Sequence, residues 1–151
     1  MHSIEPFRAR PGDPGLVAAG RSGRRAGGGV YDYADGGKVS VWPGLSGLFP
    51  SMKDQPAVEK VIQRLLHAQS LEAVHAMDEG IVSEPLEIDL AAVLGWSYPD
   101  FRGGVLAHID DTGLAEFVRQ CDALAGKHGQ RFLPPTSLRQ RAVSGQRFHS
   151  R

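Results

Sequence analysis

The sequence predicts an all-α fold, a small helical domain that follows a short β-hairpin connector. Apolar residues recur with the period of an amphipathic helix over residues 54–80 and again over 114–128. Between these segments a third apolar run spans residues 85–95, and a proline opens it. Glycine stands at or just after the end of each run, where it can adopt the left-handed conformation that stops a helix. The three runs are therefore expected to be separate helices.

The first of these helices is the longest. Asp54 and Pro56 supply start signals and Gly80 a stop signal, which leaves roughly 24 residues, or about 36 Å at ~1.5 Å per residue. We expect its buried face to be broad and to consist of Val58, Val61, Ile62, Leu65, Leu66, Ala68, Ala73, Ala76 and Met77.

The second helix begins at Pro85, with Ser83 or Glu84 as its cap, and ends at Gly95. Its apolar residues are Leu86, Ile88, Leu90, Val93 and Leu94. An aromatic loop follows, and we expect its rings to cover the end of the helical core; they belong to Trp96, Tyr98 and Phe101.

The chain divides into three predicted parts. Residues 1–19 contain several prolines and glycines and form a loose or disordered arm, with a helical turn near its end. Residues 20–50 form a Gly/Arg-rich connector, in which two short strands, 30–33 and 38–42, flank a turn typical of a hairpin. Residues 51–151 form the helical domain.

Two shorter helices complete that domain. Residues 105–109 lie in the first, and Thr112 or Asp111 is expected to cap the long helix that follows it. The last helix spans 137–143, and Phe148 is expected to anchor the polar tail behind it.

The composition bounds the class of protein. Hydrophobic residues make up 41% of the 151 residues, enough for one modest core, and the formal net charge is zero, which does not favour nucleic acid or acidic membranes as partners. The single cysteine excludes an internal disulfide, and no apolar run is long enough for a membrane span or a signal peptide. We expect a cytoplasmic protein. The excess of arginine over lysine is typical of a GC-rich bacterial genome.

Three arginines, Arg21, Arg24 and Arg25, lie in the glycine-rich segment 20–29. One interpretation is a contact with anions or nucleic acid. We favour a flexible connector with solvated charges, because no aromatic residues are interleaved with the arginines. The glycine run does not predict a phosphate loop either, since no strand precedes it and no Lys-Ser/Thr pair follows.

Histidine and acidic residues are the first candidates for chemistry. Glu72 and His75 form a Glu-x-x-His unit, which binds metals in some helical bundles, but the second unit and the further glutamates of such a site are missing, so we expect no metal. His67 and His75 are expected to be partly exposed residues of the long helix.

Two further candidates are weighed in the same way. His108 is followed by Asp110 and Asp111, which form either a His–carboxylate pair or, as we favour, a cap for the next helix. Cys121 lies on the apolar face of its helix and is expected to be a buried, inert thiol.

Two blocks of the sequence carry linked motifs. Residues 20–50 read GRSGRRAGGGVYDYADGGKVSVWPGLSGLFP, and a second block contains RLLHAQSLEAV, DEGI, EIDLA and GWSYPDFRGG in this order. Together they resemble the C-terminal region of 3-hydroxyacyl-CoA dehydrogenases, in particular the second helical repeat of the multifunctional fatty-acid β-oxidation enzymes. Val30 stands where that family usually has an aromatic residue.

The resemblance implies a helical fold like the C-terminal domain of 6-phosphogluconate dehydrogenase. In the complete enzyme it implies a Rossmann domain that holds NAD, and a catalytic histidine in a His-Phe-Phe-Asn-Pro motif. None of the six histidines here precedes phenylalanine, and Leu71 stands where the first repeat carries an active-site asparagine. We therefore assign no catalytic, cofactor-binding or metal-binding residue to this chain.

Three hypotheses remain open. The chain is the C-terminal part of a β-oxidation dehydrogenase that needs a Rossmann domain and a first helical repeat, in cis or in trans. Alternatively, it is a free-standing helical module that dimerises through an apolar surface. The third hypothesis, nucleic-acid binding through the arginine cluster, is disfavoured by the zero net charge.

Overall fold

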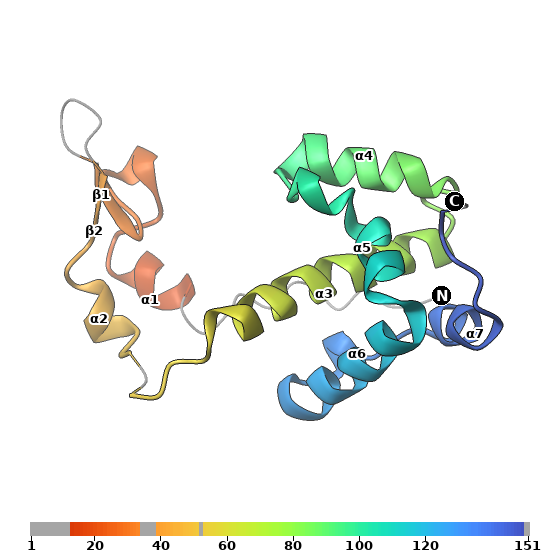
Figure 1. The fold of residues 1–151 in the computed structure, drawn as a ribbon. Coiled ribbons are helices and arrows are strands. Elements are labelled where there is room, and N and C mark those ends of the chain that lie inside the picture. Colours follow the sequence, from red (N-terminus) through yellow and green to blue (C-terminus); the bar gives the residue numbers. More distant parts are fainter. Residues whose placement is uncertain (1–12, 34–38, 52, 150–151) are drawn as a thin grey trace. The chain divides into compact units, whose positions relative to one another are not determined.

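The computed structural model describes residues 13–33, 39–51 and 53–149 (Figure 1). The chain forms two compact units, Met1–Gln55 and Pro56–Arg151. Helices dominate, and the one sheet of the described ranges is a two-stranded antiparallel hairpin in the first unit. The predicted all-α fold with a preceding hairpin is confirmed.

The first unit holds short elements only. They are α1 (Asp13–Ala18), the 3-10 turn η1 (Arg24–Ala26), β1 (Tyr31–Tyr33), β2 (Val39–Val41) and α2 (Leu45–Leu48). The strands pair with Asp32 opposite Ser40, as the hairpin prediction requires, while the predicted turn lies outside the described residues. The described end of the predicted arm forms α1, which is longer than the single turn expected there.

Arg21 organises this first unit. Its guanidinium pairs with the Asp32 carboxylate, donates to the carbonyl oxygen of Gly29 at 2.8 Å and lies 4.4 Å from the centre of the Trp42 ring. A Cβ at Gly28 would lie 2.5 Å from this guanidinium. The absence of a side chain at Gly28 therefore leaves the space that the Arg21 side chain occupies. The prediction of a connector with solvated charges is therefore wrong for Arg21, which is largely buried.

The second unit is the helical domain. Its elements are α3 (Val58–Asp78), α4 (Pro85–Trp96), η2 (Asp100–Arg102), α5 (Val105–Thr112), α6 (Leu114–His128), η3 (Gln130–Phe132) and α7 (Thr136–Ser144). The short helix α5 lies at the centre, where it packs against α3, α4 and α6, and α7 packs against α6 (Figure 1). All of the helices predicted for this domain are present.

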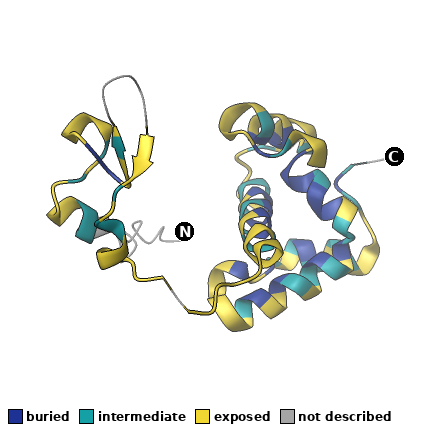
Figure 2. Cartoon of the chain, turned by 60° about the vertical axis from the view of Figure 1, so that its left-hand side comes forward, coloured by how far each residue is buried: buried dark blue, intermediate teal, exposed yellow. Residues whose placement is uncertain are grey.

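The core gathers around α5 (Figure 2). Val105, Leu106 and Ile109 are fully buried there, together with Phe117 and Cys121 of α6. The other core residues come from α3, α4, α6, η3, α7, the loop after α4 and the tail, and they are Leu66, Leu71, Ala73, Val74, Ile88, Ala92, Tyr98, Leu114, Leu124, Phe132, Leu138 and Phe148.

Helix α3 is buried along its second half only. The prediction of a broad buried face is wrong for the first turns of the helix, where Val58, Val61, Ile62 and Leu65 are exposed. The buried residues of α3 begin at Leu66, because α5 packs against the later turns. Periodicity marks a helical face that is able to pack, and the neighbouring elements decide how much of it is covered.

Some of the predicted helix ends are correct and others are wrong. Helix α3 begins at Val58, after Pro56, and α4 continues through Gly95 to Trp96, where Ser97 takes the left-handed φ of 61°; no predicted side-chain cap is made. After α3, Gly80 takes a left-handed φ of 72°, and the Ile81 N–H donates to the carbonyl of Ala76 at 3.0 Å. Pro85 is the first residue of α4, as predicted. No side chain caps α6, which begins after Gly113; the Thr112 hydroxyl instead donates to a carbonyl of its own helix, at 2.8 Å.

The N-terminus of α5 is capped from a neighbouring helix. Asp89 of α4 accepts hydrogen bonds from the N–H groups of Leu106 at 2.7 Å and Ala107 at 3.1 Å. This close approach depends on Gly104, which has a φ of 138° and lies against the Asp89 side chain. A Cβ at Gly104 would lie 2.2 Å from Cγ of Asp89, so no other residue fits without moving the cap.

We predict that Gly104→Ala destabilises the domain by roughly 3 kcal/mol or more, because it adds both a strained φ and a clash with a buried carboxylate. Gly126→Ala is the matched control, since Gly126 lies in α6 with open space around its Cβ position. That variant should gain up to about 1 kcal/mol from the higher helix propensity of alanine. Urea unfolding followed by circular dichroism measures both values, and equal effects of the two substitutions would contradict the packing argument.

Candidate functional site

The Glu-x-x-His unit, for which no metal site was expected, lies on α3. Glu72 is exposed and His75 half-buried on α3. In the ranges that the structure describes, no group of three or more His, Cys, Asp or Glu side chains is placed to hold a metal ion. A lone Glu-x-x-His unit offers two ligands at most, too few for a structural site.

His108, Asp110 and Asp111 form neither the His–carboxylate pair nor the helix cap that the sequence suggested. His108 is buried, and neither of its ring nitrogens has a hydrogen-bond partner among the described residues. Asp110 is buried too, but its carboxylate binds the C-terminal tail. The favoured prediction that these carboxylates cap α6 is therefore wrong, and Asp110 does not pair with His108.

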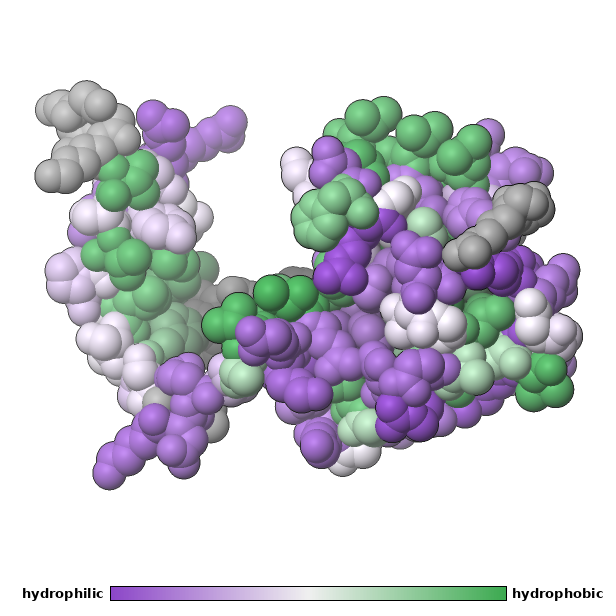
Figure 3. Space-filling model, in the orientation of Figure 1, coloured by the Kyte–Doolittle hydropathy of each residue, from purple (hydrophilic) through white to green (hydrophobic). Residues whose placement is uncertain are grey.

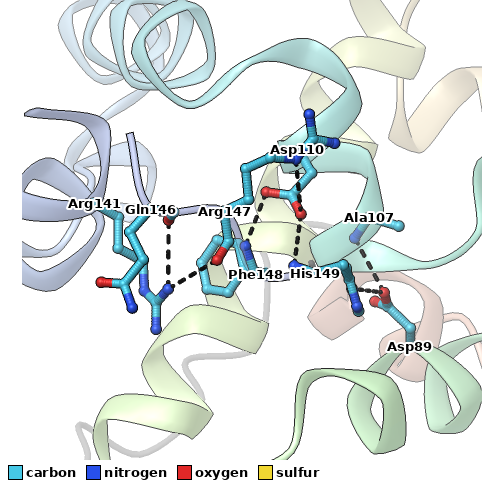
Figure 4. A network of polar contacts seen from close by, with 8 residues as sticks. All are labelled: Asp89, Ala107, Asp110, Arg141, Gln146, Arg147, Phe148 and His149. Carbon is cyan, nitrogen blue, oxygen red and sulfur yellow. Dashed lines mark hydrogen bonds and ion pairs between the residues drawn. The ribbon is translucent and has the colours of Figure 1, made fainter. Parts of the chain in front are cut away.

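Two buried aspartates hold the tail instead (Figure 4). Asp110 accepts hydrogen bonds from the backbone N–H groups of Phe148 at 3.1 Å and His149 at 2.9 Å. The Nε2 of His149 lies 2.8 Å from the carboxylate of Asp89, which also caps α5. Phe148 is buried, as the anchor prediction requires, and the Arg141 guanidinium lies 4.6 Å from its ring centre. This His–carboxylate pair joins residues 60 positions apart, so no local motif could have revealed it.

A second polar cluster lies between α3, α5 and α6. The rings of His67 and His108 have centroids 5.5 Å apart, and Phe117 stacks on His67 at 4.4 Å. His67 is buried, so the prediction that it is partly exposed is wrong. Gln120 donates from its amide nitrogen to Glu116 at 2.7 Å, which turns its oxygen towards Nε2 of His67 at 2.9 Å. His67 therefore donates this hydrogen bond from Nε2.

Burial lowers the pKa of both histidines. It lowers the pKa of His108 to about 4, with the neighbouring His67 and Arg102 acting in the same direction. Burial also lowers the pKa of His67, against the hydrogen bond that His67 donates to Gln120, which raises it. The two rings form part of the wall of a cavity with a volume of about 400 Å³, whose wall also includes Lys60. Both imidazoles pack against Phe117 in the core of the domain, and the ring nitrogens of His108 have no hydrogen-bond partner among the described residues.

The remaining candidates are structural as well. Cys121 is fully buried, and burial raises the pKa of its thiol to about 12, so the prediction of a buried, inert cysteine is confirmed. Arg24 lies 5.5 Å from the ring centre of Tyr33, and Arg21 is bound inside the first unit. Leu71 is almost completely buried in the core.

The helical domain exposes a large apolar surface on α4 (Figure 3). Tyr98 is buried as the aromatic-loop prediction requires, but Trp96 and Phe101 are exposed, which corrects that prediction for two of its three rings. The Trp96 indole N–H donates to Gln69 of α3 at 2.8 Å, beside a cavity of about 290 Å³ with an almost wholly apolar wall. Hydrophobic side chains gather along α4 in the space-filling view.

The described part of the second unit is a small helical domain with a core around α5 and exposed apolar side chains along α4. No family model matches the chain. It is 32% identical over 151 residues to the fatty acid oxidation complex subunit alpha of Shewanella amazonensis, an alignment that covers 96% of the chain and 21% of that protein. The subunit alpha of Vibrio vulnificus is 35% identical over 139 residues (89% and 19%), and that of Ectopseudomonas oleovorans 36% over 140 residues (88% and 19%).

The chain thus spans about a fifth of the length of these relatives and matches a C-terminal part of them. The chain is a homologue of this part of the fatty acid oxidation complex alpha subunits, and the resemblance to the C-terminal region of the multifunctional β-oxidation enzymes is confirmed. Over the residues with described placement, none of the helices combines the length and the apolar character that a membrane crossing requires.

We predict that the stability of the domain falls as pH drops from 6.5 towards 4. His108 has a lower pKa in the folded chain than the ordinary 6.5, so over this range the unfolded chain takes up the proton first. The stabilisation is complete above pH 6.5, and at about 1.4 kcal/mol per pKa unit its loss amounts to roughly 3 kcal/mol.

The measurement is urea unfolding at a series of pH values for the natural chain and for His108→Phe. The variant should lose most of this slope, while His128→Gln, which removes an exposed imidazole of α6, should keep it. A constant difference in the free energy of unfolding between the natural chain and His108→Phe over this pH range would contradict the assignment.

Proposed function

We propose that this chain is the C-terminal helical part of a 3-hydroxyacyl-CoA dehydrogenase of fatty-acid β-oxidation, acting as a packing and assembly module without catalytic residues of its own. In the complete enzyme, NAD-linked oxidation of 3-hydroxyacyl-CoA to 3-oxoacyl-CoA takes place on other domains. NAD and the acyl-CoA substrate are ligands of the complete enzyme, and the cytoplasm is its compartment.

The main support for this proposal is that an apolar side chain occupies the position that the resemblance associates with catalysis. Leu71 stands where the first helical repeat of the family has its active-site asparagine, and its side chain lies in the core against other apolar groups. An asparagine amide at this buried position would need a hydrogen-bond partner, and leaving it without one would cost roughly 1–3 kcal/mol of stability. The residue therefore supports packing and not contact with substrate.

The partners follow from the same argument. A domain whose polar side chains bind its own helices and tail, and whose outer helix is apolar, contributes binding surface to a larger assembly. We propose that the Rossmann domain and the first helical repeat of the enzyme are those partners, in cis or in trans. The alternative, a free-standing dimerisation module with no enzymatic role, is favoured by the same exposed helix.

The test is the oxidation of NADH with acetoacetyl-CoA by the purified chain, with circular dichroism as the check of folding. We expect a folded helical protein without turnover, because Leu71 fills the position that the resemblance associates with the active-site asparagine. Turnover by the chain alone would contradict the proposal.

The second arm adds the Rossmann domain and first helical repeat of a relative in trans. A gain in turnover or in thermal stability of the added domains supports the enzyme part of the proposal. If the folded chain changes neither the turnover nor the thermal stability of the added domains, the dimerisation module is the better-supported hypothesis. A Gly104→Ala variant, which disturbs α5 from inside, should lose any gain that the natural chain produces.

A further inference from the structure

A pocket with a basic wall lies between α3 and α6. Its volume is about 380 Å³. Helix α3 contributes Lys60 and Arg64, which stand one turn apart, and α6 contributes Arg119, Lys127 and His128. Among the described residues that form this wall, none is acidic. The chain as a whole has no net charge, so this gathering of cations on one concave surface is a local feature of the fold.

The carboxylates of α6 are bound to other side chains. Glu116 pairs with Arg119 and also accepts a hydrogen bond from the Gln120 amide at 2.7 Å. The bonds from Arg119 and Gln120 lower the pKa of Glu116 to about 2. Asp122 pairs with Arg139 of α7, whose Nη1 lies 3.0 Å from the carboxylate. Neither acid is therefore available to the remaining cations of the pocket.

Three of the cations are left without a counter-charge. In the ranges that the structure describes, the ion pairs include none of Lys60, Arg64 and Lys127. Like charges one turn apart on a helix repel each other, as Lys60 and Arg64 do. Arg64 is half-buried, and its Nε has no hydrogen-bond partner among the described residues. An anion in the pocket would offset the repulsion and give the guanidinium an acceptor.

The shape of the pocket favours a small molecule over a protein surface. Small-molecule sites are concave and have volumes of about 300–1,000 Å³, a range that includes this pocket. Gln63 donates to Gln120 at 2.5 Å, which ties α3 to α6 beside the cations. The buried Leu124 adds an apolar part to the wall. The pocket thus offers positive charge for one end of a ligand and apolar contact for the rest.

We propose that this basic pocket binds a small phosphomonoester, with the phosphate group held by Lys60, Arg64 and Lys127. A phosphate ester carries a charge of about −1.5 to −2 near pH 7, whereas a carboxylate carries a single charge and would leave most of the excess uncompensated. The guanidinium fork of arginine matches two phosphate oxygens, and the lysines act as point charges. The inference does not rest on the proposed function, because the whole wall belongs to this chain.

The experiment is calorimetric titration of the whole chain at low salt. The probes are two esters of different size, glycerol 3-phosphate and AMP, their phosphate-free counterparts glycerol and adenosine, and inorganic phosphate. We expect at least one ester to bind with a Kd of about 1 mM or lower, inorganic phosphate to bind several-fold more weakly, and the phosphate-free counterparts not to bind. Binding should weaken as salt is added, because the exposed cations are then screened.

Three variants locate the site. Arg64→Gln should weaken ester binding about tenfold, the loss expected when one charge-assisted contact is removed. Arg64→Lys keeps the charge without the fork and should fall between this variant and the natural chain. Arg131→Gln removes an exposed arginine of η3 outside the pocket wall and should leave the Kd unchanged. Without ligand, Arg64→Gln should be at least as stable to urea as the natural chain, since it removes a repulsive charge.

Four outcomes would overturn the proposal. Neither ester binds at concentrations up to about 10 mM. Arg131→Gln weakens binding as much as Arg64→Gln, which indicates a general attraction between anions and basic side chains. Glycerol or adenosine binds as tightly as its ester, which excludes the phosphate group as the bound part. Inorganic phosphate binds as tightly as both esters, in which case the pocket holds a phosphate ion alone.

Discussion

The helical unit depends on the carboxylate of Asp89. This buried group accepts two backbone N–H groups at the start of α5 and lies within hydrogen-bonding distance of the His149 imidazole in the tail. The start of a helix carries partial positive charge, so a carboxylate there is stabilised, but without these partners its burial would cost several kcal/mol. One side chain thereby fixes α4, α5 and the C-terminal tail together, and Gly104 is the residue that leaves room for it.

The position of α5 decides in turn what is core and what is surface. The Ser70 hydroxyl of α3 donates to the carbonyl of Val105 at 2.7 Å, which ties α5 to the later turns of α3. Those turns are buried, while the first turns of the same helix keep an exposed apolar stripe. The core histidines His67 and His108 follow from the same geometry, because they lie where α3, α5 and Phe117 of α6 meet.

Sequence patterns predicted the elements of this domain well and its polar contacts poorly. Helix periods, Pro85 and Gly80 mark local conformations, and local conformation is set by near neighbours in the chain. The pair of Asp89 and His149 spans 60 residues and depends on how three elements meet, so it left no local signal beyond a charged residue inside an apolar run. The burial of His67 was missed for the same reason, since a helical period does not say which turns a neighbouring helix covers.

The two faces of α4 have different surroundings, one in the core and one at the surface of the domain. Its inner face holds the domain together through Asp89 and Ile88, and it needs nothing from the outer leucines. Lysine or glutamate at positions 86, 90 and 94 would form the helix nearly as well and would improve solubility in a chain of zero net charge. Exposed leucines at a regular spacing on a short helix are what the proposed assembly role requires. Leu71 shows the same preference inside the domain, because an apolar packing group stands where the resemblance associates a polar, catalytic one.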